Sequence, residues 1–406
     1  MAAAAATAPA DAAATPDAGA AAAASKPIGH YLGANDMLLR RDSAGEWVRM
    51  APRSPLTAGQ QLLALPAFRT LVVLADMNVY LTGGARVELL PAAAAADGPV
   101  DVAMHLPFGQ AILNAGLNGN RVLLSLVDQE RVVELGPSSS LAIEVRRIFE
   151  PGGLQQRTPA PAEVTWYLTS GRATRAGGAE VQAPATWTTI AGQDSTPEPL
   201  DEAPGWVDRD PLSTLERGAR DRVAEALLAD EPVNLKLREL SDKTGLGRRV
   251  EVRTLAARCG TYVGLFEPIV RALGDVDQRA FWKSHIESLR DAIARDPGSV
   301  EAIHAALEME RGAQAADDLM EMVLGFDRAA VGTTREEVQQ GALLRLLRWM
   351  ENEDLVYRVL ALYNVNQITG TTNLGGYRPE QTAQQRERAM RFYWQALDNG
   401  DLIRKP

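Results

Sequence analysis

The sequence is poor in the residues from which many common sites are built. Its 406 residues include one cysteine, Cys259, and four histidines. A single cysteine excludes an intramolecular disulfide and any zinc site that uses several cysteines. Apolar runs of about 18 residues, which a membrane-spanning helix needs, are also missing. Catalytic signatures such as Gly-x-Ser-x-Gly and His-Glu-x-x-His do not occur, so no enzyme class is indicated.

The charge is moderate and unevenly distributed. Of a net charge of −10 at pH 7, residues 1–192 carry 14 basic and 16 acidic side chains, and residues 193–406 carry 28 and 36. The second half is therefore the acidic one. Nucleic-acid binding depends on concentrated Lys and Arg, so this balance predicts no nucleic-acid partner. We expect no cofactor, because no cofactor-binding signature is present.

The beginning of the chain has a biased composition. Residues 1–25 are nearly all Ala, with some Thr, Pro, Asp and Gly. They lack the basic start and the Leu-rich centre of a secretion signal. A segment of this kind has too little bulky apolar surface to form a core. We therefore predict a disordered Ala-rich spacer over residues 1–27.

A boundary falls at residues 193–211. This segment has four prolines and six acidic residues against one arginine, which is too much proline for a helix or an inner strand. Short alternating apolar runs precede it, and long charged segments with a helical period follow. The sequence thus predicts a β domain at 28–192, a linker at 193–211 and an α-helical domain at 212–406. Trp206 and Val207 are the apolar exceptions in the linker, which predicts that it docks against one domain.

The first domain has the pattern of a β-sheet protein. A hairpin is expected around the turn Ser43–Gly45. The segment LTAGQQLL at residues 56–63 returns fifty residues later as LPFGQAIL at 106–113, and each copy is followed by strand-like runs. One such sheet leaves an apolar face that a second copy can cover. We predict an all-β sandwich or roll built from a duplicated β-meander.

After the boundary the apolar residues follow a helical period. Asp210–Pro211 is expected to start the first helix, Thr334 with Glu337 forms a capping box, and Asn399–Gly400 ends the last helix. Further helices are expected over 234–244, 249–259, 262–273, 278–295, 299–311, 314–325, 334–350, 353–364 and 380–398. Short loops between them predict an all-α bundle or a short α-solenoid, and the sequence leaves both open.

The few polar clusters in the helical half have simple interpretations. Gly245–Gly247 lacks the third glycine and the Lys-Ser/Thr of phosphate-binding loops, so an inter-helix turn is expected. The basic stripe that follows is expected to be a solvated face; it consists of Arg248, Arg249, Arg253 and Arg258. Cys259 follows two alanines and is expected in the core. Glu301, His304 and Glu308 share a helix face, for which a solvated surface is favoured over a metal site.

One loop differs from the charged helices around it. Residues 365–379, VNQITGTTNLGGYRP, are uncharged up to Arg378. Loops of this length are either functional or mobile. We predict that it borders a partner-binding groove, formed by Asn366, Asn373, Tyr377 and Arg378.

A family resemblance rests on the first copy of the repeat. Trp47 is followed by a Leu-x-x-Gly-Gln-x-Leu step and then by an alternating run; the matching residues are Leu56, Gly59, Gln60, Leu62 and NVYLTGGARVELL at 78–90. This order resembles the start of a FecR-like domain. The second copy and residues 164–171 are similar to the later strands of that family. The resemblance covers residues of about 45–190, and the helical half resembles HEAT-like domains, which bind proteins.

The resemblance implies a non-enzymatic sensory, regulatory or scaffolding protein on the envelope side, linked to sigma-factor signalling through a membrane helix. The Ala-rich start is similar to the spacer that follows such a helix. We therefore expect the exported part of a longer or membrane-anchored product, in the periplasm or cell envelope, with the cytoplasm left open. Its partner would be another protein, and membrane contact would come only through a segment absent from this chain. No catalytic or cofactor residues come with the resemblance.

Two alternatives remain. The first is a carbohydrate- or surface-binding β-sandwich on a helical scaffold, which aromatics on one exposed sheet face would favour: Trp166, Tyr167 and Trp187. The second is an enzyme in the helical half, which would require Glu301, His304 and Glu308 to converge with His285 in a deep pocket.

Overall fold

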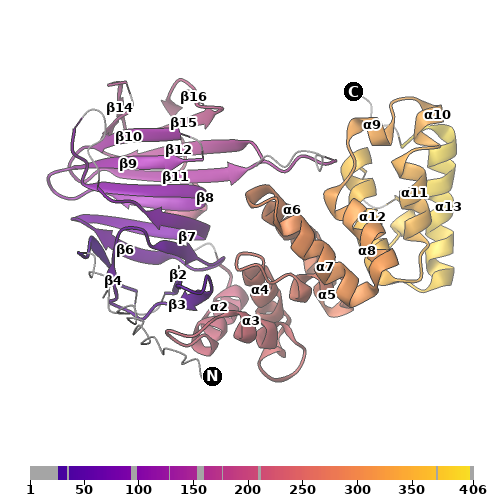
Figure 1. Ribbon diagram of the computed structural model, residues 1–406. Coiled ribbons are helices and arrows are strands. Elements are labelled where there is room, and N and C mark those ends of the chain that lie inside the picture. The colour runs from indigo at the N-terminus through magenta and orange to yellow at the C-terminus, as the bar shows by residue number, and fades with distance from the viewer. Residues whose placement is uncertain are drawn as a thin grey trace, which may run out of the picture.

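A computed structural model describes residues 26–33, 36–92, 98–127, 129–152, 160–175, 177–208, 212–371 and 374–402. Strands fill the first half and helices the second, as the sequence predicts (Figure 1). The spacer predicted at 1–27 lies outside the described residues, apart from Lys26 and Pro27. In the described part of the chain, none of the helices combines the length and apolar content needed to cross a membrane.

The β domain is a single folded sheet. Its strands are β1 (Gly29–Tyr31), β2 (Leu38–Arg41), β3 (Trp47–Arg49), β4 (Pro55–Leu56), β5 (Gln61–Ala64), β6 (Thr70–Leu74), β7 (Met77–Leu89), β8 (Val102–Asn114), β9 (Asn120–Leu126), β10 (Gln129–Leu135), β11 (Ser140–Arg147), β12 (Ala162–Ser170), β13 (Arg172–Thr174), β14 (Glu180–Gln182) and β15 (Ala185–Ile190). The predicted hairpin at Ser43–Gly45 is confirmed, because β2 pairs with β3 around it. The pairings are antiparallel except that of β8 with β9.

Two long strands fold the sheet into two layers. Residues 77–82 of β7 and 109–114 of β8 belong to one layer, whose order is β4-β1-β6-β7-β8-β11-β12-β15. The remaining halves of β7 and β8 belong to the other layer, ordered β3-β2-β5-β7-β8-β9-β10-β13-β14. Alternate residues of both layers, such as Leu81, Leu124 and Ile143, fill the core between them. The predicted sandwich therefore closes through two shared strands.

The repeated segments place their glycine in the same backbone conformation. Gly59 has φ of 83° and Gly109 has φ of 100°, in the left-handed region that favours glycine. The first copy makes a turn between β4 and β5, whereas the second lies inside β8 and bends it. Strands β6 and β7 follow the first copy, and β9 to β11 follow the second. One motif thus supplies a turn in one place and a kink in the other.

The second half consists of packed helices. They are α2 (Thr214–Ala226), α3 (Asn234–Ser241), α4 (Val250–Gly260), α5 (Glu267–Leu273), α6 (Trp282–Arg295), α7 (Ser299–Arg311), α8 (Ala313–Leu324), α9 (Arg328–Val331), α10 (Arg335–Val338), α11 (Ala342–Met350), α12 (Leu355–Thr369) and α13 (Ala383–Asn399), with 3-10 turns η2 (Gly245–Gly247), η3 (Val276–Phe281) and η4 (Leu374–Gly376). Successive helices pack in pairs, such as α3 with α4 and α11 with α12, in a row that leads away from the sheet (Figure 1).

Helix ends follow local sequence signals. The capping box of Thr334 and Glu337 and the left-handed Gly400 after α13 are confirmed. The start of the first long helix differs from the prediction, because Ser213 caps α2 in a capping box with Glu216. Asp210 and Pro211 lie outside the described residues. The serine hydroxyl accepts from a free backbone N–H of the first turn, which is the reason this residue type ends the irregular segment.

The helices meet the sheet first at what we call the base contact, α2–α4 against β2, β3 and β5. Leu39, Leu63 and Phe68 of the β domain share one apolar cluster with Val223 and Leu237 of the helices. Residues 229–233 also bond to the edge strand β3, where the N–H of Val233 donates to the carbonyl of Trp47 (3.1 Å). A covered edge strand cannot recruit a further strand.

A second junction, the arm contact, joins residues 148–152 after β11 to α6, α8 and α12. The Phe149 ring lies 5.2 Å from the guanidinium carbon of Arg290, which is 7% exposed. Arg290 Nε donates to the carbonyl of Val323 (2.8 Å), and the N–H of Gly152 donates to the carbonyl of Leu324 (3.1 Å). Carbonyls in the last turn of a helix lack helical partners and carry partial negative charge. Arg290 and the backbone N–H of Gly152 therefore supply hydrogen bonds to the C-terminal carbonyls of α8.

The predicted linker lies against the β domain. It contains β16 (Gln193–Asp194), β17 (Glu198–Pro199) and α1 (Gly205–Asp208), and both strands pair with β15. Val207 is 4% exposed in a cluster with Ile112 and Ala142, and the Trp206 ring packs edge-on against Tyr167 at 6.1 Å. The expected docking of this segment on one domain is confirmed.

Candidate functional site

The predicted partner loop is largely structural. α12 extends to Thr369, so Asn366 lies on a helix; Asn373 lies outside the described residues. Tyr377 is 1% exposed, and its hydroxyl donates to the carbonyl of Met350 (2.5 Å). Burial raises the pKa of Tyr377, which stays a neutral core phenol. Tyr377 therefore cannot present itself to a partner as predicted, and of this set Arg378 is the exposed member.

The helical half does not bring the predicted histidines together. His285 is fully buried and bonds Gln278 Oε1 through Nε2 (2.9 Å), whereas His304 pairs with Asp317 at the surface (2.9 Å). Among the described residues no group of three His, Cys, Asp or Glu side chains is arranged to hold a metal ion. The convergence required for the enzyme alternative is therefore not found.

Cys259 and Gly245–Gly247 behave as predicted. Cys259 is buried, and burial raises the pKa of its thiol to about 12, far from a reactive thiolate. Gly245–Gly247 forms the turn η2 between α3 and α4. The aromatic face expected for carbohydrate binding is not exposed, because Trp166 and Trp187 stack in the core with ring centroids 5.6 Å apart.

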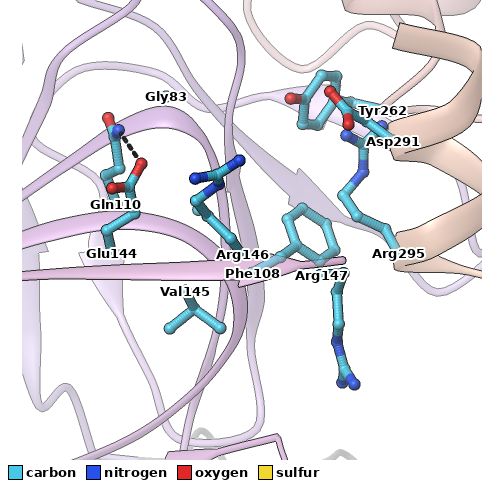
Figure 2. Close-up of a pocket in the computed structure, with 11 residues that line it drawn as sticks. Gly83, Phe108, Gln110, Glu144, Val145, Arg146, Arg147, Tyr262, Asp291 and Arg295 are labelled. Atoms are coloured by element: carbon cyan, nitrogen blue, oxygen red, sulfur yellow. Dashed lines mark hydrogen bonds between the residues drawn. The ribbon is translucent and has the colours of Figure 1, made fainter. Parts of the chain in front are cut away.

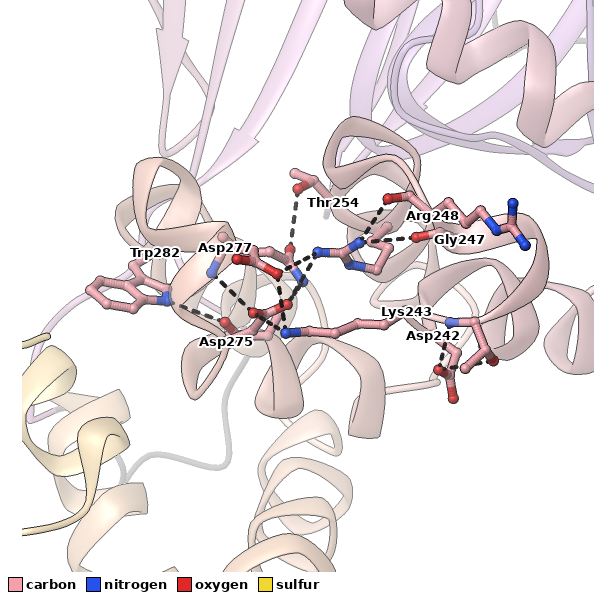
Figure 3. Close-up of polar contacts among 12 residues, drawn as sticks. Asp242, Lys243, Gly247, Arg248, Thr254, Asp275, Asp277 and Trp282 are labelled. Atoms are coloured by element: carbon pink, nitrogen blue, oxygen red, sulfur yellow. Dashed lines mark hydrogen bonds and ion pairs between the residues drawn. The ribbon is translucent and has the colours of Figure 1, made fainter.

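Arg253 contradicts the prediction of a solvated basic stripe. It is 4% exposed, and its guanidinium donates to the carbonyl of Gly247 (3.0 Å) and to Asp275 Oδ2 (3.3 Å). Lys243 reaches Asp275 Oδ1 from the other side at 2.8 Å (Figure 3). Burial alone would raise the pKa of Asp275, but the bond from Lys243 holds that pKa below its usual range. Arg253 is therefore a structural residue, and its hydrogen bonds hold η2, α4 and η3 together.

This network leads to His285. Thr254 donates to Gln278 Oε1 (3.1 Å), the same oxygen that His285 Nε2 contacts, which makes Nε2 the protonated nitrogen. His285 Nδ1 is buried without a partner. Burial lowers the pKa of His285 to about 3, because a second proton on the ring would place an uncompensated charge in the core. The bonds from Thr254 through Gln278 to His285 therefore form a neutral structural link between α4 and α6.

A surface groove lies between α2, η2 and the start of α4. Its lining includes Arg222, Leu246, Arg248 and Arg249, around a volume of about 410 Å³. Leu246 is 37% exposed, and Arg248 and Arg249 have no ion-pair partner among the described residues. A Cβ added at Gly218 in the groove would meet nothing within 4 Å. An apolar centre with a basic rim suits an acidic segment that carries an apolar anchor.

A second cavity, the junction pocket, lies where the β domain faces α6, between the base and arm contacts (Figure 2). The β domain contributes the kinks of β7 and β8 and the end of β11; the helical half contributes Tyr262, in the turn after α4, and Asp291 and Arg295 of α6. Its volume is about 170 Å³. Drug-sized ligands occupy pockets of about 300 Å³ or more, so this cavity has room only for a small molecule or ion.

The glycines of the two kinks shape this pocket. Gly83 and Gly84 have φ of 63° and 76°, and a Cβ at Gly84 would lie 2.3 Å from the Tyr262 ring. A Cβ at Gly109 would lie 2.2 Å from the Cα of Ala85. Glycine is thus required for the two strands to cross and for Tyr262 to approach them. The bend that closes the sandwich also creates the pocket wall.

The pocket holds charges without direct partners. Among the described residues, the side chains of Arg146 and Asp291 make no hydrogen bond or ion pair, and Arg295 Nη2 is a buried donor without an acceptor. The guanidinium carbon of Arg295 lies 3.9 Å from the Tyr262 ring centroid. Burial raises the pKa of Asp291, although the positive charges of Arg295 and Arg146 oppose this. Sequence reasoning missed this set, because Arg146 lies 145 residues before Asp291 and only the fold joins them.

No family model, curated protein or solved structure matches the chain.

Proposed function

We propose that this chain is a non-enzymatic regulatory or scaffolding protein of the cell envelope, similar in role to FecR-like regulators, which holds another protein at the groove between α2, η2 and α4. The observation that carries the proposal is the groove itself. It combines an exposed Leu246 with Arg248 and Arg249, which no acidic side chain of the described chain neutralises. Unpaired arginines around an apolar centre are typical of protein interfaces.

The position of the groove supports this role. It lies on α2–α4, the helices that share an apolar core with β2, β3 and β5. A partner bound there would contact the part of the helical half that is fixed to the sheet. The arm contact fixes the distant helices as well, through Arg290 and Gly152. A scaffold of this kind would keep its partner in a defined position relative to the β domain.

Site-specific crosslinking tests the proposal. A photoreactive amino acid at Leu246, in the producing cells, is expected to capture one acidic protein, and the same probe at Leu117 on the β domain, which is 85% exposed, is the matched control. Replacing both Arg248 and Arg249 by Glu should abolish the adduct, since it reverses the charge that would attract an acidic partner and places like charges opposite each other. An adduct of equal yield at both positions, or one that survives the double replacement, would exclude the groove.

A second pair of variants tests whether filling the groove prevents capture when its charge is unchanged. Gly218→Trp should fill the groove and prevent capture, whereas Gly218→Ala adds one methyl group in open space and should leave capture intact. Cell fractionation tests the proposed location, with recovery in the envelope fraction expected. Recovery of the full-length product in the cytosol alone would argue against an envelope role and leave the groove experiment unaffected.

A further inference from the structure

The junction pocket contains charges of both signs that form no direct ion pair with one another. Asp291 and Arg295 are four residues apart on α6, a spacing at which opposite charges normally pair. They form no ion pair, because Arg295 stacks on the Tyr262 ring (3.9 Å) and lies 5.3 Å from the centre of Phe108. The two rings therefore hold the guanidinium in place without satisfying its hydrogen-bond donors.

Arg146 supplies a second guanidinium from the β domain. In Figure 2 the side chains of Arg146 and Arg295 extend to the same side of Phe108, whereas Arg147 points the other way. Gln110 donates to Glu144 (2.9 Å), which engages one of its oxygens and leaves its negative charge at the pocket wall. The cavity is thus faced by two arginines and the Tyr262 hydroxyl, and by the carboxylates of Asp291 and Glu144. Arg295 Nη2 is a buried donor without an acceptor, so the pocket suits a ligand that supplies one.

We propose that the junction pocket binds a small tetrahedral oxyanion that carries a proton, with hydrogen phosphate as the reference ligand. The arginines of the two domains would bind its charged oxygens, since guanidinium groups bind oxyanions through directed hydrogen bonds. Asp291 would accept the hydrogen bond of the protonated oxygen. A flat carboxylate ligand offers only two oxygens in one plane, whereas donors here come from separate walls. The volume of about 170 Å³ holds such an ion with a few water molecules.

Bound in this way, the ion would bridge the two halves of the chain. Arg146 belongs to β11, and Asp291 and Arg295 belong to α6. The bridge would lie between the base and arm contacts. The inference does not depend on the groove proposed for a partner protein, and the two sites share no residue.

Calorimetric titration of the full chain at pH 7 and constant ionic strength tests the inference. Inorganic phosphate should bind with saturable heat, and sulfate, which has no proton to donate to Asp291, should bind about tenfold more weakly. Glycerol 3-phosphate distinguishes the free ion from a phosphate monoester, and tighter binding of the ester would identify it as the better ligand of the same site. Acetate should not bind, and acetate binding as tight as phosphate would overturn the assignment.

Variants locate the binding. Arg146 is exposed, so Arg146→Gln should fold normally and weaken phosphate binding about tenfold; Arg295→Gln should do the same. Asp291→Asn should bring the affinities for sulfate and phosphate within about twofold of each other, because an amide donates to an unprotonated oxygen. Arg391→Gln, on the exposed surface of α13, is the control and should bind phosphate like the unmodified chain. If phosphate gives no saturable heat, or if Arg146→Gln binds it unchanged, the inference is wrong.

Discussion

The base and arm contacts join the same two halves of the chain by different chemistry. At the base, Phe68 and Leu63 of the β domain are buried among α2–α4 with almost no exposed surface. At the arm, a charged Arg290 is buried among carbonyls, an amide and two aromatic rings. Apolar burial is non-directional and tolerates small shifts, whereas the bonds of Arg290 hold at one geometry only. The base should therefore fix the halves together, and the arm should fix their orientation.

The largest change in the free energy of unfolding is expected from a substitution in the base contact. Phe68→Ala should lower the free energy of unfolding by about 3–5 kcal/mol, because it removes a buried ring from a cluster shared by both halves. Urea unfolding followed by circular dichroism and by tryptophan fluorescence measures this. Leu117→Ala, at a side chain that is 85% exposed, should change it by no more than about 0.5 kcal/mol. A loss at Phe68 no larger than at Leu117 would show that the base does not hold the halves together.

A smaller effect is expected from the arm. Arg290→Met should cost about 2–3 kcal/mol, since it leaves the carbonyl of Val323 and the side chain of Asn364 without their donor. Amide hydrogen exchange should accelerate at residues 148–152 and 322–325 and remain slow in α2–α4. Arg391→Met removes an exposed pair with Glu387 and should cost about 0.5 kcal/mol or less. Equal acceleration in α2–α4 would contradict a separate role for the arm.

The free energy of unfolding should depend on pH through His285 of α6. The unfolded chain protonates this ring near pH 6.5, whereas the folded chain resists protonation down to about pH 3. Unfolding therefore takes up a proton in this window, and stability should fall as the pH drops, by up to about 1.4 kcal/mol per pH unit. His285→Gln should flatten this slope between pH 6 and 5, whereas His304→Gln, at the surface, should not. A slope unaffected by His285→Gln would show that the ring is protonated in the folded chain.

The smallest effect on overall stability is expected in the segment docked on β15. Val207→Asp should release α1 and change the free energy of unfolding by about 1 kcal/mol or less, because only a short element comes loose. Limited proteolysis should then cut on both sides of Trp206 at least tenfold faster than in the unmodified chain. Val207→Ile is the control and should stay resistant. Rapid cleavage in the unmodified chain would show that this segment is a free tether.

The broad architecture could be predicted from the sequence because it depends on local patterns. Alternating residues identified the strands, and caps such as Thr334 with Glu337 identified helix ends. Burial of polar residues could not be predicted in the same way. Arg253 and Tyr377 have ordinary surface contexts in the sequence, and only the packing of neighbouring elements buries them. The charges of the junction pocket come from β11 and α6, so no local sequence pattern predicts that they lie together.

The two kinked strands also tie the registers of the two layers together. Because β7 and β8 each continue through both layers, an inserted or deleted residue inside either one would turn every side chain beyond it to the opposite face. Such a change would expose part of the core in one layer even though the other layer stayed intact. Changes in chain length should therefore be disruptive within Met77–Leu89 and Val102–Asn114. Because both strands are kinked and shared by the two layers, the number of residues in β7 and β8 is constrained as strongly as the residue types.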